Sequence, residues 1–262
     1  TIEKAKAGQK PPPSPTPLPQ GVEFFDPDPN RPGMTYGNDY YRGDAKSPVV
    51  VLSFEDFNNA DAAKQFTDVE PTLKSKYIDQ KIVRFVTVLF PQQAPQAAAA
   101  VLCAGQQNKF WEFRALLYQK QSEWTEGDAT GMAEFAKSLG LDEKAFTDCT
   151  QSEAVQNQVS AALSFAQESV GVPVAPSYLV LKLDANGKVE NGKGFPGALP
   201  LEQFEQAIQD IQAPPTPTPP PGSVQRVLGV TTRGETYDPA VQKLMAQAGV
   251  RWVRTSVWWE SI

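Results

Sequence analysis

The stretch VVVLSFEDFNNADA, residues 49–62, joins an apolar segment to the start of an amphipathic helix. The run VVVLSF reads as a buried strand, because strands covered on both faces are apolar at every position. A helix is predicted over residues 60–79, where Phe66, Val69 and Leu73 recur at helical spacing. The turn between strand and helix is therefore the first place to look for a functional site.

The sequence up to residue 212 predicts a mixed α/β domain. IVRFVTVLF (82–90) reads as a second strand, and residues 94–167 look helical. SYLVLKL (177–183) is a third strand, and DANGK turns it into a partner strand near Val189, because Asn-Gly favours a two-residue hairpin. A last helix is predicted over residues 200–211. The order is strand, helix, strand, long helical insertion, hairpin and helix.

Composition excludes several classes of function. The 262 residues contain no histidine, which removes a Ser-His-Asp triad and imidazole zinc sites. The net charge of -6, without clustered Lys and Arg, argues against a nucleic-acid partner. We predict no metal and no cofactor. No apolar run reaches the roughly 18 residues that a membrane span needs, so membrane attachment would require an anchor outside this sequence.

Two proline-rich runs, PPPSPTPLP (11–19) and APPTPTPPP (213–221), punctuate the chain. Such runs favour extended spacers, so they mark domain boundaries. The predicted organisation is a linker over 1–20, a domain over 21–212, a linker over 213–222 and the beginning of a second domain over 223–262. Stalks of this composition suit exported proteins. We therefore predict an extracytoplasmic location, secreted or membrane-anchored, with a cytoplasmic linker as the alternative.

Several segments resemble the DsbA-like branch of the thioredoxin superfamily over residues of about 33–212. They include VVVLSFEDF, KIVRFVTVLFP, AAAAVLCAGQQNKFWEFRALLYQKQSEW and VGVPVAPSYLVL. The resemblance implies the α/β fold class, namely a thioredoxin fold with an inserted helical domain, here flanked by Pro-rich linkers and a partial βαβ unit.

The family places Asp-Phe-x-Cys-x-x-Cys at the turn into the first helix. Here Asn59 and Ala62 stand in the two cysteine positions, with Ala60 and Asp61 between them. Disulfide exchange proceeds by thiolate attack on sulfur, and neither an amide nor a methyl group forms a mixed disulfide. The degenerate motif is therefore expected to be redox-inactive.

The family also places a proline, typically cis, in a loop that faces this turn. Ala175 and Pro176 occupy that place. One alternative is that Pro176 only shapes its loop. The other is that the face between Asn59 and Pro176 holds an extended chain through backbone hydrogen bonds, which would make a protein or envelope component the partner.

Two further groups of residues stand out. Glu55, Asp56 and Asp61 form an acidic cluster at the helix start, which we interpret as helix capping rather than acid–base catalysis. Cys103 and Cys149 match positions where some members of the family carry a structural disulfide. The alternative is two buried free thiols.

Residues 223–262 read as a βαβ unit that stops at its second strand, RWVRTSVWW. The unit resembles the opening of a (β/α)8 barrel of the glycoside hydrolase kind, whose catalytic carboxylates would lie at later strand ends. Trp258, Trp259 and Glu260 are possible sugar-binding residues, so carbohydrate is a second candidate partner. A truncated barrel is the preferred interpretation, and pairing with a neighbouring molecule is the alternative.

Three functional hypotheses follow. The preferred one is a redox-inactive binding or assembly module of an exported or envelope-associated protein. The second is an accessory domain of a longer extracytoplasmic glycoside hydrolase, whose catalytic carboxylates lie beyond residue 262. The third is a thiol oxidoreductase that uses Cys103 or Cys149, which lack a neighbouring thiol or cationic group to lower the pKa. Enzymatic activity is therefore not predicted for these residues by themselves.

Overall fold

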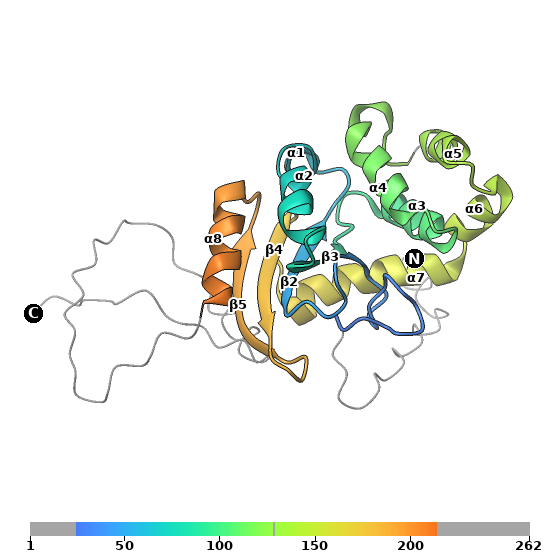
Figure 1. The fold of residues 1–262 in the computed structure, drawn as a ribbon. Helices are drawn as coiled ribbons and strands as arrows, with labels where there is room; N and C mark the ends of the chain where they lie inside the picture. Colours follow the sequence, from blue (N-terminus) through green and yellow to red (C-terminus); the bar gives the residue numbers. More distant parts are fainter. Residues whose placement is uncertain (1–24, 128, 214–262) are drawn as a thin grey trace, which may run out of the picture.

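The computed structural model describes residues 25–127 and 129–213. Their centre is a five-stranded sheet in the order β1-β3-β2-β4-β5 (Figure 1). The strands are β1 (Tyr40–Arg42), β2 (Val49–Glu55), β3 (Val83–Leu89), β4 (Ser177–Leu183) and β5 (Val189–Pro196). β2 and β3 are parallel, and the other neighbouring pairs are antiparallel. The hairpin predicted after DANGK is the β4–β5 pair.

The two central strands are buried at every position, as their apolar sequences predict. A parallel pair needs a crossover connection, which here consists of α1 (Ala60–Asp68), α2 (Glu70–Leu73) and the π-helical segment η1 (Lys74–Ile78). The prediction of one helix over 60–79 is wrong in this respect. Pro71 lies in the first turn of α2 and has no N–H to continue the α1 hydrogen-bond ladder.

The helical insertion lies to one side of the sheet (Figure 1). In the described residues it comprises α3 (Pro95–Gln106), α4 (Phe110–Gln119), η2 (Gln121–Glu123), α5 (Ala129–Ser138), α6 (Glu143–Thr150), α7 (Glu153–Ser164) and η3 (Phe165–Val170). Every residue of α3 from Ala97 to Gly105 is buried, because its small side chains let neighbouring helices approach closely. The predicted helical insertion is confirmed as a bundle of short helices.

Both faces of the sheet are covered. One face packs Val49, Val51 and Phe85 against α2, η1 and α8 (Leu201–Gln212). The other face packs Val50 and Leu52 against η3 and the loop that follows it. Alternate residues of β2 thus enter different cores, which explains why the strand is apolar throughout. The fold class is the predicted α/β thioredoxin-like fold with an inserted helical domain.

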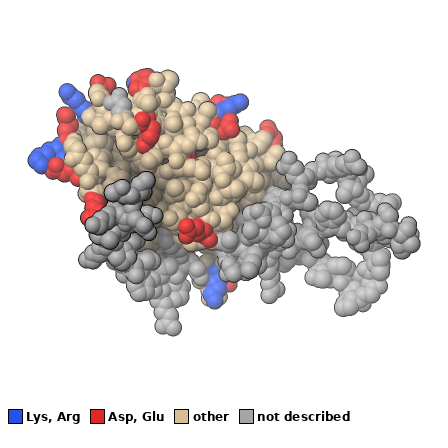
Figure 2. Space-filling view, turned by 180° about the vertical axis from the view of Figure 1, so that it is seen from behind, with Lys and Arg blue, Asp and Glu red and all other residues tan. Residues whose placement is uncertain are grey.

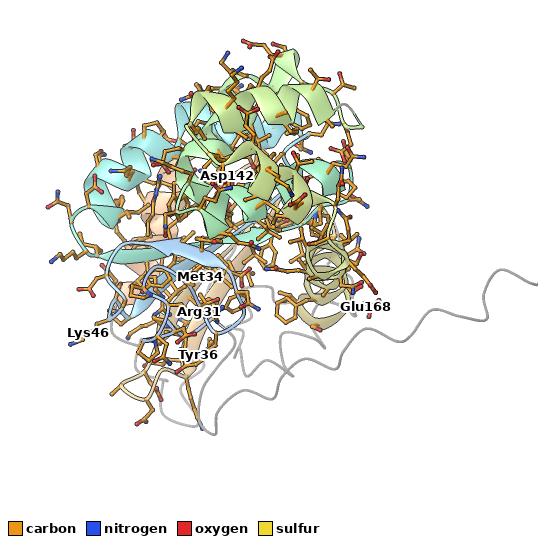
Figure 3. All side chains as sticks on the ribbon, turned by 90° about the vertical axis from the view of Figure 1, so that its right-hand side faces the viewer. Arg31, Met34, Tyr36, Lys46, Asp142 and Glu168 are labelled. Carbon is orange, nitrogen blue, oxygen red and sulfur yellow. A yellow bond between two sulfur atoms is a disulfide. The ribbon has the colours of Figure 1, made fainter. Side chains whose placement is uncertain are left out.

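The chain enters the sheet through a turn-rich loop before β1. Arg31 donates from Nε to Asp28 at 2.6 Å within this loop. Figure 3 shows Arg31, Met34 and Tyr36 of the loop below the helical insertion, which carries Asp142. From behind, Figure 2 shows Lys and Arg side chains scattered at the margins of the described surface rather than gathered on it.

Some predictions fall outside the described residues. These are the linkers, the partial βαβ unit over 223–262 and its residues Trp258, Trp259 and Glu260. They remain predictions, as do the domain boundaries. Within residues 25–127 and 129–213, no helix has the length and apolar character of a membrane span.

Candidate functional site

Asn59 occupies the turn between β2 and α1 and makes hydrogen bonds in two directions. Its Oδ1 accepts from the N–H groups of Asp61 at 2.8 Å and Ala62 at 3.0 Å, so it is the N-cap of α1. Its Nδ2 donates to the carbonyl oxygen of Ala175 at 2.9 Å. The side chain in the first cysteine position therefore ties the helix start to the loop before Pro176.

The loop side of the site contains a cis peptide bond between Ala175 and Pro176. Ala175 and Pro176 are buried, whereas Val174 is 41% exposed. The Ser177 hydroxyl donates to the carbonyl oxygen of Val174 at 2.6 Å. Val174 thus presents an apolar side chain to solvent next to the residue that binds Asn59. The predicted residues at 59 and 175–176 do come together.

The helical insertion fixes the turn from a third side. Gln121 in η2 donates from Nε2 to the carbonyl oxygens of Phe57 at 2.7 Å and Asn59 at 3.1 Å. The remaining residues of the degenerate motif diverge: Ala60 and Asp61 are exposed, and Ala62 is buried against the helical insertion. Sequence reasoning missed Gln121, because only the tertiary fold brings it to the turn.

Asp56 lies beneath the turn and acts as a hydrogen-bond acceptor. Its carboxylate accepts from the N–H groups of Gln93 at 2.6 Å and Asn58 at 3.1 Å. Burial raises the pKa of Asp56, and these backbone hydrogen bonds oppose that shift. Glu126 plays a similar part at the start of α3, where it accepts from Gln96 N at 2.6 Å. Asp56 therefore binds N–H groups outside α1, whose N-cap is Asn59, so the capping predicted for the acidic cluster is wrong for Asp56.

Glu55 belongs to a different structure, a buried ion network between the sheet and the helices. Arg114 donates to Glu55 at 2.8 Å from both Nε and Nη2, and to Glu70 at 2.6 Å from Nη2. Tyr118 adds a hydrogen bond to Glu55 at 3.1 Å. Burial alone would lower the pKa of Arg114, but the two carboxylates raise it well above its ordinary value. Sequence spacing gives no sign of this network.

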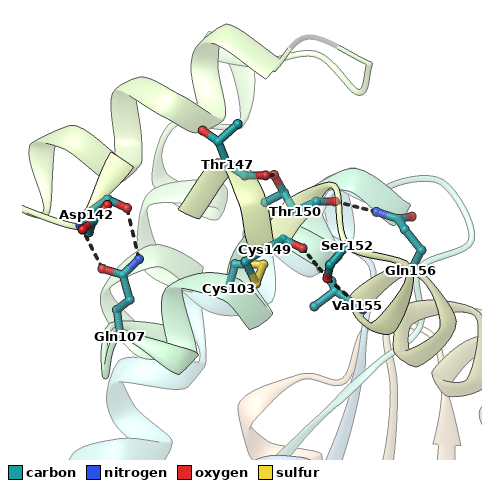
Figure 4. The surroundings of a disulfide bond; sticks show 9 residues. All are labelled: Cys103, Gln107, Asp142, Thr147, Cys149, Thr150, Ser152, Val155 and Gln156. Carbon is teal, nitrogen blue, oxygen red and sulfur yellow. Dashed lines mark hydrogen bonds between the residues drawn. A yellow bond between two sulfur atoms is a disulfide. The ribbon is translucent and has the colours of Figure 1, made fainter. Parts of the chain in front are cut away.

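A disulfide joins Cys103 in α3 to Cys149 in α6, the pair that the family resemblance implies (Figure 4). Asp142 and Gln107 link the same two helices, since Asp142 N donates to Gln107 Oε1 at 2.8 Å and Gln107 Nε2 donates to Asp142 O at 3.3 Å. Ser152 donates to the carbonyl oxygen of Cys149 at 2.7 Å. Cys103 is buried and Cys149 is half-buried, so the bond lies inside the helical insertion.

The chain has the fold of a thioredoxin-like protein. It combines the sheet order β1-β3-β2-β4-β5 with a capped helix after β2 and a cis-proline loop that faces the start of this helix. The chain belongs to the family described as Thioredoxin, which it matches over residues 35–210.

Curated relatives carry more specific names. A protein of Rickettsia felis, named "Putative protein-disulfide oxidoreductase", is 24% identical over 147 residues, covering 55% of this chain and 53% of that protein. The Na(+)/H(+) antiporter NhaA 3 of Salinispora tropica is 25% identical over 180 residues, covering 67% of this chain and 25% of that protein. The chain spans about half the length of the Rickettsia relatives it matches.

Solved structures share the fold. Wolbachia pipientis alpha-DsbA1 has a TM-score of 0.59 at 20% identity, covering 68% of this chain and 92% of that one. Bacillus subtilis BdbD in its oxidised form has a TM-score of 0.53 at 21% identity, covering 65% of this chain and 90% of that one.

The relatives correct one prediction. The sequence alone does not predict enzymatic activity for these residues, but several relatives are named as protein-disulfide oxidoreductases, which contradicts that prediction. The prediction of no enzymatic activity rests mainly on the absence of thiols at positions 59 and 62. The chain also carries a disulfide between Cys103 and Cys149.

Proposed function

We propose that this chain binds an extended polypeptide across the face formed by Asn59, Val174 and Pro176, without dithiol exchange at positions 59 and 62. The hydrogen bond from Asn59 to the Ala175 carbonyl supports this proposal, because it preserves the juxtaposition of helix start and proline loop where no thiol is present. The exposed side chain of Val174 supplies an apolar contact. A partner would be a protein or an envelope component in extended conformation.

The hydrogen bonds around the face hold the turn in one conformation, which favours a role in binding. The turn is held by Gln121, by Asp56 and by the bridge from Asn59 to Ala175. A face that is fixed before binding loses little conformational entropy when a ligand arrives. Asn59 carries a neutral amide and Ala62 a methyl group, so the face keeps side chains at both positions but has no thiolate for disulfide exchange.

Val174→Asp tests the proposal. The variant places a charge in the apolar contact, and we expect it to weaken binding of a reduced, carboxymethylated unfolded protein by tenfold or more, or about 1.4 kcal/mol. Ile82→Asp is the matched control, because Ile82 is also a large exposed apolar residue, at 37% exposure, and lies at the opposite end of β3 from the site. Equal loss of binding in both variants, or in neither, would rule out this face as the binding surface.

The relatives' names favour a second candidate, a thiol–disulfide oxidoreductase. Cys103 and Cys149 are the two cysteines of this sequence, so exchange by this chain alone would have to use them. An insulin-reduction assay on the native chain and on Cys103→Ala/Cys149→Ala tests this candidate. Turnover that disappears in the double variant would establish it. Absence of turnover in the native chain would favour binding alone.

We also propose an extracytoplasmic location. The disulfide supports this location, because such bonds persist in oxidising compartments and are rare in the cytosol of mesophiles. Alkylation of thiols in intact cells, followed by mass spectrometry, tests it. The proposal requires Cys103 and Cys149 to resist alkylation until a reductant is added.

A further inference from the structure

A small cavity lies where α1, α2 and α4 meet the sheet, beside the buried ion network. Its volume is about 10 Å³, which is close to the least that holds one water molecule. The residues of the proposed binding face, Asn59, Val174 and Pro176, do not line it. The cavity is therefore a separate feature of the fold. Polar side chains form much of its wall, among them Ser53, Glu55, Gln65, Glu70, Arg114 and Tyr178.

Gln65 brings an unpaired polar atom to this cavity. Its side-chain oxygen, Oε1, is buried and accepts no hydrogen bond from the residues that the structure describes. A buried oxygen in this position costs free energy, because it has lost contact with solvent and has gained no donor. The side chain as a whole is half-buried, so its amide has room to shift toward a molecule in the cavity. Gln65 thus needs a hydrogen-bond donor on the cavity side.

Glu70 provides a second acceptor in the same wall. Arg114 donates to its two oxygens, from Nη1 at 2.9 Å and from Nη2 at 2.6 Å. A carboxylate oxygen has about two lone pairs, so each oxygen of Glu70 keeps capacity for a further donor. Glu55 has less capacity, because four different side chains already donate to it. The cavity therefore suits one molecule that donates twice, to Gln65 and to Glu70.

The charges of the network select a neutral ligand. Glu55 and Glu70 carry two negative charges, and Arg114 pairs with both of them. Arg42 supplies the second positive charge, at 3.8 Å from Glu70. Because these charges balance, neither a cation nor an anion is favoured in the cavity. A water molecule is neutral, fits the volume and donates two hydrogen bonds, and the Tyr178 hydroxyl in the wall is a donor from which it can accept.

We propose that this cavity binds one water molecule, which donates to Gln65 Oε1 and to the Glu70 carboxylate. Gln65 belongs to α1 and Glu70 is the first residue of α2, so the water joins the two helices across their junction. Pro71 follows Glu70 and has no N–H for the helical hydrogen-bond ladder at this point. The water also couples α1, which begins at the turn of Asn59, to the ion network around Arg114.

Magnetic relaxation dispersion of water on the full chain tests this inference, because it counts the water molecules that a protein holds in its interior. Gln65→Met keeps a side chain of similar length and removes the acceptor, so we expect it to lose one long-lived water relative to the native chain. Gln203→Met is the matched control, since it makes the same change at an exposed position of α8, and it should keep the native count. Equal counts in the native chain and Gln65→Met, or an equal loss in both variants, overturn the inference.

A crystal structure of the native chain provides a test that does not depend on the folding of a variant. We expect one ordered water within hydrogen-bonding distance of both Gln65 and Glu70. An empty cavity contradicts the inference, and so does a reversed Gln65 amide whose Nε2 donates directly to Glu70. Neither result bears on the proposed function, because Val174→Asp changes a face that does not line the cavity.

Discussion

Replacing Asn59 tests the physical basis of the site most directly. Asn59→Ala removes both the cap of α1 and the bond to Ala175. Loss of an N-cap costs about 0.5–2 kcal/mol, and loss of one hydrogen bond costs about 0.5–1.5 kcal/mol. The free energy of unfolding should therefore fall by roughly 1–3.5 kcal/mol. The upper part of this range is favoured, because Ala175 is buried and its carbonyl oxygen would lose a partner.

Asn59→Asp separates the two contributions. An aspartate can still accept from the helix N–H groups, and its charge is favourable at a helix N-terminus by about 0.3–1 kcal/mol. It cannot donate to Ala175, so only the bridge between turn and loop is lost. We expect the aspartate variant to be less destabilised than the alanine variant, and still less stable than the native chain.

Urea unfolding of the oxidised chain, followed by tryptophan fluorescence, measures these differences in the free energy of unfolding. The comparison assumes that all variants share one slope of this free energy against urea concentration. Asn58→Ala is the matched control, because Asn58 is the exposed neighbour in the same turn and should change stability by less than about 0.5 kcal/mol. If Asn59→Ala also falls within that margin, the assignment of Asn59 as cap and bridge is wrong. If Asn59→Asp exceeds the native chain in stability by about 0.3–1 kcal/mol, the full gain expected from its charge, the bond to Ala175 contributes nothing.

Three further predictions concern the framework of the site. Arg114→Leu leaves the buried carboxylate of Glu55 without its cation and leaves Glu70 with only Arg42, at 3.8 Å. Chemical denaturation should show a loss of about 3–5 kcal/mol that shrinks at acidic pH, and a pH-independent loss would contradict this. Cys103→Ala/Cys149→Ala opens a loop of 46 residues and should cost about 4 kcal/mol in the chain-entropy model, measured against the oxidised native chain; an unchanged stability would contradict this. Burial raises the pKa of Asp56 above 3.8 in the folded chain, so ionising this carboxyl is harder in the folded than in the unfolded state. Its ionisation therefore lowers the free energy of unfolding. The native chain should therefore lose stability relative to Asp56→Asn as pH rises from 3.8 through the raised pKa, and the opposite slope would refute this sign.

Local patterns predict most of the fold. The apolar runs at 49–54 and 82–90 become the two central strands, because strands covered on both faces need apolar residues at every position. The DANGK turn predicts the hairpin that follows β4, since Asn-Gly determines its own turn geometry. The helix boundaries are less accurate. Pro71 interrupts the helix predicted over 60–79, and the π-helical η1 continues it with a different hydrogen-bond spacing.

The sequence by itself determined which residues lie at the turn, because Asn59 and Ala62 follow a recognisable strand and helix start. It also determined that no thiol stands at these positions. Only the tertiary structure decided what Asn59 does, since Ala175 is 116 positions away in the chain. The same holds for Gln121 and for the ion network around Arg114. Hydrogen bonds and ion pairs act over a few ångströms of space, and folding alone brings these distant residues within that range.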